Sequence, residues 1–237
     1  MEYDVIVVGA GHAGIEAAHI AAKMGASTLL ITLDDQKIGV MPCNPSIGGL
    51  GKGHIVFEVS ALGGLMPKLC THTHLQARML NTRKGPAVQG LRLQIDKYAY
   101  SEAARKSLLE TPNLTIHQDM VIDIASNRTV RCRSGKEFSS KALVITSGTY
   151  LNGMIHVGME KRPGGKDDTE AVNNLSESLE SLLGVPLGRL KTGTPPRLLK
   201  SSIDFSRLER QSAHSLDYLF EFTPVRSQET QPCYIAY

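Results

Sequence analysis

The start of the chain holds a glycine-rich turn between an apolar run and a helix pattern. Residues 5–8 form a continuous apolar run, which is typical of a strand buried on both faces of a sheet. The next six residues open an alanine-rich helix and have the spacing G-x-G-x-x-G: Gly9, Ala10, Gly11, His12, Ala13 and Gly14. A strand, a glycine turn and a helix in this order predict a dinucleotide-binding unit, because the helix N-terminus holds a pyrophosphate.

Each glycine of this segment, called the glycine turn (residues 9–14) below, has a role in that interpretation. Gly9 permits a tight turn, Gly11 lets the backbone reach the pyrophosphate, and Gly14 allows the helix and the strand to pack closely. The alternative is a glycine-rich connection between strand and helix that binds no ligand.

The second strand of the predicted unit, residues 27–32, does not end on the acidic residue that usually holds the ribose of a dinucleotide. Thr32 takes that position, and Asp34 and Asp35 follow slightly late. The sequence therefore assigns no ribose contact to either aspartate.

The remaining apolar patterns predict an α/β fold. Helices are expected at residues 55–61 and within 94–110, and a buried strand at 114–119. Residues 120–141 alternate apolar and polar side chains around two turns, which predicts a small antiparallel meander before an apolar strand at 142–146. We therefore expect a Rossmann-like domain with a parallel sheet and an antiparallel β-meander insert.

Composition and cysteine usage are those expected of a protein in a reducing compartment. The 237 residues carry a formal net charge of +3, which tolerates a nucleic-acid partner without demanding one. No apolar run is long enough to span a membrane, and the first residues lack the basic region of a signal peptide. We expect a cytoplasmic protein, and the strand-like ending QPCYIAY suggests a piece of a longer chain. The four cysteines are widely spaced and form no C-x-x-C pair, which fits a reducing cytoplasm: Cys43, Cys70, Cys132 and Cys233.

A second glycine-rich stretch, MPCNPSIGGLGKGH, covers residues 41–54. It is not a Walker P-loop, because Ser46 stands where that motif begins with glycine and Gly53 stands where it has a hydroxyl residue. An NTPase of that class is therefore excluded. Three interpretations remain open: Gly48 and Gly49 bring backbone N–H groups against a flavin, Cys43 is a reactive thiol, or the stretch is an ordinary connection. Spacing alone favours an inert cysteine.

Two weaker patterns lie in the middle of the chain. Cys70, His72 and His74 have the spacing C-x-H-x-H, which would place all three on one face of a strand. No fourth ligand is evident nearby, so we predict no metal site. Basic side chains recur in this region, either as an RNA-facing surface or as a solvated loop face: Lys52, Lys68, Arg78, Arg83, Lys84 and Arg92.

Six segments spread over nearly the whole chain form a more specific pattern: VIVVGAGHAGIEAA, MPCNPSIGGLGKGH, ALGGLM, RMLNTRKGPAV, GRLKTGTPPR and QPCYI. Together they resemble the N-terminal portion of the glucose-inhibited division protein A (MnmG) family, the tRNA uridine 5-carboxymethylaminomethyl modification enzymes. The resemblance implies an FAD-dependent enzyme that acts on C5 of the wobble uridine (uridine 34) of tRNA. Such enzymes use NADH as reductant and methylene-tetrahydrofolate as one-carbon donor, and act as homodimers with a GTPase partner, MnmE.

The same resemblance implies domains and site residues. It predicts an FAD-binding domain over residues 1–200 and, over residues 201–237, the beginning of an inserted NADH-binding domain. The glycine turn would bind the FAD pyrophosphate, and Val121 matches a position that touches FAD through its backbone. Gly48 and Gly49 would lie beside the flavin. Cys43 matches the cysteine of the family's CNP loop and is expected to be catalytic, as nucleophile or as general acid/base.

Three alternative functions follow from the same residues. A related folate- and FAD-dependent tRNA uridine methyltransferase fits the segment LN-x-x-KGPAV less well. A truncated module would bind a nucleotide without catalysis, and a generic FAD/NADH oxidoreductase would act without tRNA. Arg83 and Gln89 also depart from the family pattern around KGPAV, where a small and a basic residue are usual.

Overall fold

The computed structural model describes residues 2–42, 44–165, 172, 174–193, 195–225, 227 and 229–235. They fall into two compact units: unit 1 within Met1–Pro42 and Ala104–Thr192, and unit 2 within Cys43–Ala103 and Gly193–Tyr237. The chain thus leaves unit 1 after its first 42 residues and returns to it within a helix. The boundary near residue 200, expected from the family resemblance, stays a prediction.

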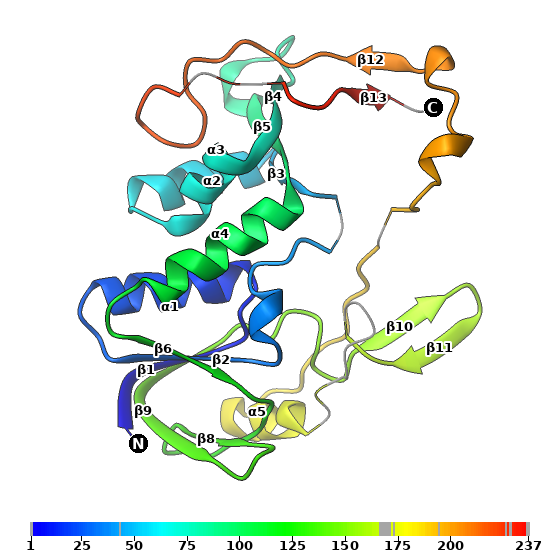
Figure 1. Ribbon diagram of the computed structural model, residues 1–237. Helices are drawn as coiled ribbons and strands as arrows, with labels where there is room; N and C mark the ends of the chain where they lie inside the picture. Colours follow the sequence, from blue (N-terminus) through cyan, green and yellow to red (C-terminus); the bar gives the residue numbers. More distant parts are fainter. Residues whose placement is uncertain are drawn as a thin grey trace. The chain divides into compact units, whose positions relative to one another are not determined.

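Unit 1 is built on a six-stranded sheet with the strand order β6-β2-β1-β9-β8-β7 (Figure 1). Four of its strands pair in parallel: β1 (Glu2–Val8), β2 (Thr28–Thr32), β6 (Leu114–Gln118) and β9 (Glu137–Ile145). The sheet continues beyond β9 with two antiparallel strands, β7 (Val121–Ile124) and β8 (Thr129–Cys132). The predicted α/β class, with a parallel sheet and an antiparallel meander, is confirmed.

Helices complete unit 1. α1 (His12–Lys23) packs against β1 and β2 through its buried residues, which are mostly small: Gly14, Ile15, Ala18 and Ala22. α5 (Leu175–Leu183) packs against β7, and α4 (Lys97–Leu109) begins in unit 2 and ends in unit 1. A two-stranded hairpin of β10 (Met154–Val157) and β11 (Glu160–Pro163) follows the sheet in sequence.

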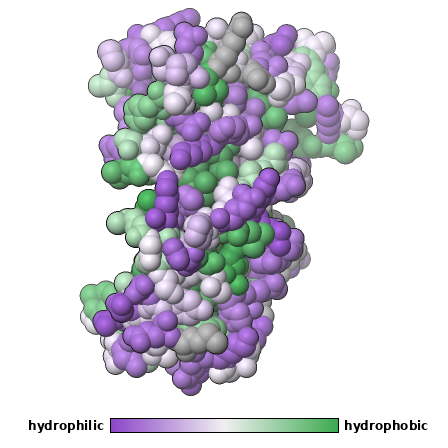
Figure 2. All heavy atoms as spheres, turned by 60° about the vertical axis from the view of Figure 1, so that its left-hand side comes forward, coloured by the Kyte–Doolittle hydropathy of each residue, from purple (hydrophilic) through white to green (hydrophobic). Residues whose placement is uncertain are grey.

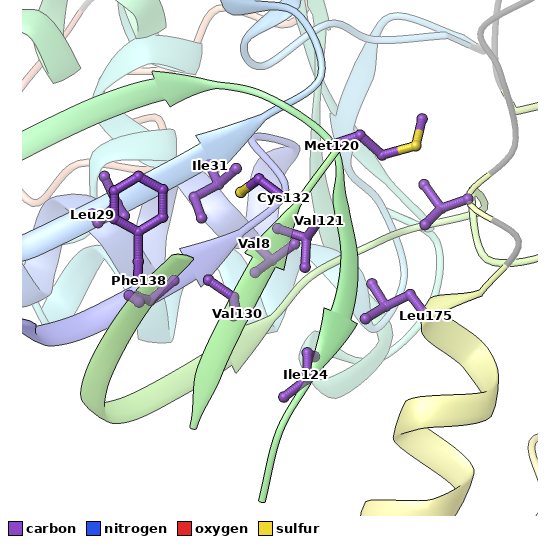
Figure 3. Close-up of a cluster of buried hydrophobic side chains, with 12 residues drawn as sticks. Val8, Leu29, Ile31, Met120, Val121, Ile124, Val130, Cys132, Phe138 and Leu175 are labelled. Atoms are coloured by element: carbon purple, nitrogen blue, oxygen red, sulfur yellow. The ribbon is translucent and has the colours of Figure 1, made fainter. Parts of the chain in front are cut away.

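One hydrophobic core joins the parallel strands to the meander (Figure 3). Val8, Leu29 and Ile31 come from β1 and β2, and Val130 and Phe138 come from β8 and β9. Each fully buried aliphatic side chain of this size contributes about 1.5–3 kcal/mol of transfer free energy. The meander is therefore an integral part of unit 1, and its residues are held against the ends of the parallel strands.

Unit 2 holds a three-stranded antiparallel sheet with the order β3-β5-β4. Its elements are β3 (Ser46–Gly48), α2 (Lys52–Ala61), α3 (Leu65–Thr73), β4 (His74–Leu80) and β5 (Gly90–Ile95). Near the end of the chain, β12 (Glu209–Gln211) pairs with β13 (Cys233–Ile235), which contains the strand pattern seen there in the sequence.

The helix α3 was not expected. It places Pro67 within its first turn, where the missing N–H breaks no helical hydrogen bond. The strand arrangement considered for the C-x-H-x-H pattern is therefore wrong, since Cys70 and His72 lie on α3 and His74 begins β4.

The surface mixes polar and apolar residues. The face shown in Figure 2 has hydrophilic and hydrophobic side chains interspersed over its extent. Among the described residues, none of the helices combines the length and the apolar character that crossing a bilayer requires. Most of the basic side chains between residues 52 and 92 are exposed on unit 2: Lys52, Lys68, Arg83 and Lys84.

Candidate nucleotide-binding site

The glycine turn joins β1 to α1, and two of its glycines are required by the chain itself. A Cβ on Gly14 would lie 1.8 Å from the carbonyl oxygen of Gly9. Gly9 has a φ of +99°, and a Cβ there would lie 2.5 Å from the carbonyl oxygen of Thr146. The Thr146 hydroxyl in turn lies 2.9 Å from both the Val8 and the Gly9 carbonyl oxygens, which fixes the end of β1.

Gly11 differs from these two glycines. A Cβ on Gly11 would have no atom within 4 Å, and its φ of −74° is one that any residue adopts. Packing within the chain therefore gives no reason for a glycine at this position. The room beside Gly11 is what the close approach of a pyrophosphate to the backbone would need.

The N-terminus of α1 adds a favourable field at the same place. Gly11 is the N-cap residue, and no side chain caps the helix there. The first turn of an α-helix has N–H groups without intrahelical partners, and the helix dipole places partial positive charge at this end. An anionic group beside Gly11 would be stabilised by both effects.

A cavity of about 320 Å³ lies over the glycine turn within unit 1. Its walls include the glycine turn, the end of β2 and the segment that follows it, the start of β7, the loop after β9 and the start of α5. The residues that carry the argument are Gly9, Ala10, Gly11, His12, Asp34, Asp119, Val121 and Thr146. The fold thus brings Val121 to the same cavity as the glycine turn, although more than 100 residues separate them. Ala13 is exposed and Gly14 lies on the buried face of α1, and neither lines the cavity.

The side chains of the two aspartates after β2 have different neighbours. Asp34 lines the cavity, and its carboxylate lies 3.6 Å from the ammonium group of Lys37. Asp35 begins a short 3₁₀ turn and pairs instead with Arg105 at 3.3 Å. Thr32, which takes the usual place of the acidic residue, also lines the cavity, and its hydroxyl donates to the carbonyl oxygen of Asp34.

The second glycine-rich stretch belongs to unit 2. Gly48 has a φ of +94°, and a Cβ there would lie 2.1 Å from the carbonyl oxygen of Leu91 and 2.6 Å from the ring of Phe220. Packing within unit 2 therefore already requires this glycine. Gly49 also has a positive φ, but a Cβ there would meet only Leu80, at 3.8 Å. Cys43 lies outside the described residues.

The residues of the C-x-H-x-H pattern do not form one ligand set. The Cys70 side chain is fully buried, whereas His72 is exposed and its Nδ1 lies 2.7 Å from the carbonyl oxygen of Lys68. His74 places its Nδ1 2.6 Å from the carbonyl oxygen of Thr71. Residues two apart on a helix do not face each other, which explains the separation of Cys70 and His72.

A group of residues missed by the sequence analysis reaches the cavity through one member, Asp119. His117, at the end of β6, Asp119, after β6, and Cys132, at the end of β8, lie together. Burial alone raises the pKa of the Asp119 carboxyl, but hydrogen bonds from Ser134 and the Met120 N–H, together with His117 nearby, hold that pKa below its usual range. Asp119 is therefore a carboxylate at neutral pH.

The Cys132 thiol is expected to resist alkylation in the folded chain. Burial, with a contribution from Asp119, raises its pKa from 9.0 to about 11. Its thiolate fraction at pH 8 is then roughly a hundredfold below that of an ordinary cysteine. We expect iodoacetamide to modify the half-buried Cys233 well before Cys132, as read by peptide mass spectrometry. Rapid modification of Cys132 in the folded chain would contradict this assignment.

The same shift fixes the direction of a pH effect. The native state binds the Cys132 proton more tightly than the unfolded chain does. The contribution of the Cys132 thiol to the free energy of unfolding is therefore complete below pH 9 and is lost as the pH rises toward 11.

Comparisons with known proteins agree with this fold. The family model described as "Glucose inhibited division protein A" matches residues 4–237. The tRNA uridine 5-carboxymethylaminomethyl modification enzyme MnmG of Campylobacter fetus is 50% identical over 242 residues, which cover 100% of this chain and 39% of that protein. The mitochondrial 5-taurinomethyluridine-tRNA synthase subunit of Macaca fascicularis is 42% identical and is covered to 36% of its length.

A solved structure shows the same arrangement of elements. GidA of Aquifex aeolicus superimposes with a TM-score of 0.92 at 43% sequence identity, over 98% of this chain and 40% of that one. The chain therefore spans about two fifths of the length of the relatives that it matches. The family model, which covers almost the whole chain, and these identities lead to one conclusion: the chain belongs to the glucose inhibited division protein A family.

Proposed function

We propose that this chain is the FAD-binding part of an enzyme that installs the 5-carboxymethylaminomethyl group on wobble uridine 34 of tRNA. Membership of the family and the names of its relatives support the reaction. The observation that carries the cofactor assignment is Gly11, a glycine that the chain's own packing does not require and that lines the cavity at the N-terminus of α1.

The residues of unit 1 fit this cofactor. The FAD pyrophosphate would bind at the N-terminus of α1, against the backbone of Gly9, Ala10, Gly11 and His12, which line the cavity; the part proposed for Ala13 and Gly14 rests on the family resemblance. Val121, which lines the same cavity, would contact FAD through its backbone. When bound, FAD would supply the redox chemistry of the reaction.

Other assignments rest on the family resemblance rather than on the geometry of unit 1. In these assignments, the backbone of Gly48 and Gly49 contacts the flavin. Cys43 is the catalytic residue. NADH would be the reductant and methylene-tetrahydrofolate the one-carbon donor. A GTPase of the MnmE type would be the partner, and the enzyme would act as a cytoplasmic homodimer.

Cys43 has a defined task in this proposal. Its thiolate would add to C6 of the uridine, so that C5 becomes nucleophilic and attacks the methylene carbon of methylene-tetrahydrofolate, where a carbon–nitrogen bond breaks and leaves its electron pair on the folate nitrogen. Loss of the C5 proton and expulsion of the thiolate would then restore the aromatic base. A wobble base suits this chemistry, because it lies in a single-stranded loop and is accessible without opening a duplex.

Substitution of Cys43 tests the reaction. In the longer protein that carries this chain, Cys43→Ser is expected to lower formation of the modified uridine by about 100-fold or more, since serine is a far weaker nucleophile. The modified nucleoside is measured by mass spectrometry of tRNA digested after reaction with the GTPase partner. FAD content should be unchanged.

Cys233→Ser serves as the matched control, because Cys233 is the half-buried cysteine on β13. This variant is expected to retain activity. Full activity of Cys43→Ser would remove Cys43 from the mechanism. The unsubstituted protein provides a further test. If it binds FAD and reduces dyes but forms no modified tRNA, a generic oxidoreductase is favoured.

A further inference from the structure

Three side chains of metal-binding type meet at Asp119, which lines the cavity, and the proposed reaction uses none of them. One ligand atom each from His117, Asp119 and Cys132 lies within 4.8 Å of the other two. The meander brings them together: the N–H of Arg133, next to Cys132, donates to the carbonyl oxygen of Met120, next to Asp119, at 2.8 Å. Cys132 belongs to the buried cluster of Figure 3, which also contains Ile31.

His117 is the least satisfied member of this group. Its Nε2 is buried and makes no hydrogen bond within the described part of the chain. The nearest carboxylate oxygen, Oδ2 of Asp119, lies 3.6 Å away, which is too long for a hydrogen bond. The ring is held edge-on against Phe138, with 5.1 Å between the ring centroids. A buried polar nitrogen without a partner is costly, so its persistence here points to a ligand.

The spacing of the three atoms suits a tetrahedral ion. Bonds of 2.0–2.3 Å to zinc place neighbouring ligand atoms roughly 3.3–3.8 Å apart. The separation between Nε2 of His117 and Oδ2 of Asp119 is 3.6 Å, within that range. The separations that involve the Cys132 sulfur are at most 4.8 Å, so rotation of the Cys132 side chain has to close them by no more than about 1 Å.

The surroundings of Asp119 orient it as a ligand. Its Oδ1 accepts the Met120 N–H at 2.8 Å, and its Oδ2 accepts the hydroxyl of Ser134 at 2.5 Å. Its side chain is only 10% exposed, so the carboxylate is fixed rather than solvated. Hydrogen bonds of this kind position carboxylate ligands around metal ions.

We propose that His117, Asp119 and Cys132 bind a divalent transition-metal ion of the zinc type. Imidazole, carboxylate and thiolate are the three ligand classes of zinc in proteins. Binding would release the thiol proton of Cys132 to solvent, and the thiolate would become the third protein ligand. Because Asp119 lines the cavity, the fourth position would be open to water from it. The site borders the cavity proposed for FAD, but the proposed FAD chemistry uses none of its three residues.

Cobalt provides a probe that reports both binding and ligand type. The purified chain is freed of metal with a chelator and titrated with Co²⁺ in the absence of FAD. We expect one equivalent to bind, with the visible bands of tetrahedral cobalt and a near-ultraviolet thiolate-to-metal charge-transfer band. Competition with Zn²⁺ should abolish both. Absence of Co²⁺ and Zn²⁺ uptake would overturn the proposal.

Variants assign the ligands. Cys132→Ser should remove the charge-transfer band, and His117→Asn and Asp119→Asn should each lower the affinity by about 100-fold or more. Asp119→Asn is nearly isosteric, so it remains informative if the core position Cys132 tolerates no substitution. His72→Asn and Cys233→Ser lie outside the group and should bind like the unsubstituted chain. Equal affinity in all five variants would place the metal elsewhere and contradict the assignment.

Discussion

Replacement of Gly14 by alanine is expected to destabilise unit 1 by at least about 3 kcal/mol, the upper range for overpacking. The added Cβ would lie 1.8 Å from the carbonyl oxygen of Gly9. That contact is between backbone-fixed atoms, so no side-chain rotation relieves it, and α1 must move away from β1. The effect is measured as the free energy of unfolding, by denaturant titration followed by circular dichroism.

Gly11→Ala is the matched control for this prediction. It makes the same chemical change three residues earlier, at a position with an ordinary φ and no atom within 4 Å of the new Cβ. We expect its free energy of unfolding to stay within about 1 kcal/mol of that of the unsubstituted chain. If Gly14→Ala proved equally stable, the close approach of α1 to β1 would be refuted.

The second prediction with a large effect is that Gly11→Ala weakens the binding of FAD. Its methyl group would occupy room beside the backbone that the pyrophosphate needs. We expect the dissociation constant for FAD to rise by at least about tenfold, equivalent to about 1.4 kcal/mol. The constant is measured by titration of the chain with FAD, followed by the change in flavin fluorescence.

Gly188→Ala provides the comparison for the binding effect. Gly188 lies in unit 1, outside the cavity lining, and a Cβ there also meets no atom within 4 Å. FAD affinity should be unchanged in this variant. Unchanged affinity in Gly11→Ala as well would show that the pyrophosphate does not bind at Gly11.

The sequence predicted the parts of the fold that local patterns determine. The run at residues 5–8, the glycine turn and the alanine-rich helix all act over short distances, and the structure has β1, the turn and α1 in that order. The roles expected for Gly9 and Gly14 agree with the two short contacts that a Cβ would make there. Periodicity likewise predicted the meander.

What the sequence did not predict depends on contacts between distant segments. Thr71 and His72 resemble strand residues, yet they lie on α3. Gly48 is also required by packing against Leu91, a contact that the local glycine pattern does not signal; its contact with the flavin stays a proposal. Tertiary packing overrides local preference at such positions.

The polar group at the cavity wall shows the same limit. Asp119 and Cys132 are 13 residues apart, and no motif spacing links them. They meet because the meander returns Cys132 to the end of β6. Likewise, the 3₁₀ turn at Asp35–Lys37, which the sequence pattern does not signal, separates Asp34 in the cavity from Asp35 beside Arg105.

The measurement that most directly tests the central claim is a titration of the purified chain with FAD in competition with ADP. The glycine turn, the N-terminus of α1 and the cavity all belong to unit 1, so the pyrophosphate-bearing half of the cofactor needs only this unit. We expect saturable binding of one FAD per chain, displaced by ADP but not by riboflavin, which lacks the pyrophosphate. Absence of saturable binding of both FAD and ADP, or displacement by riboflavin alone, would contradict the assignment of the cavity to a dinucleotide.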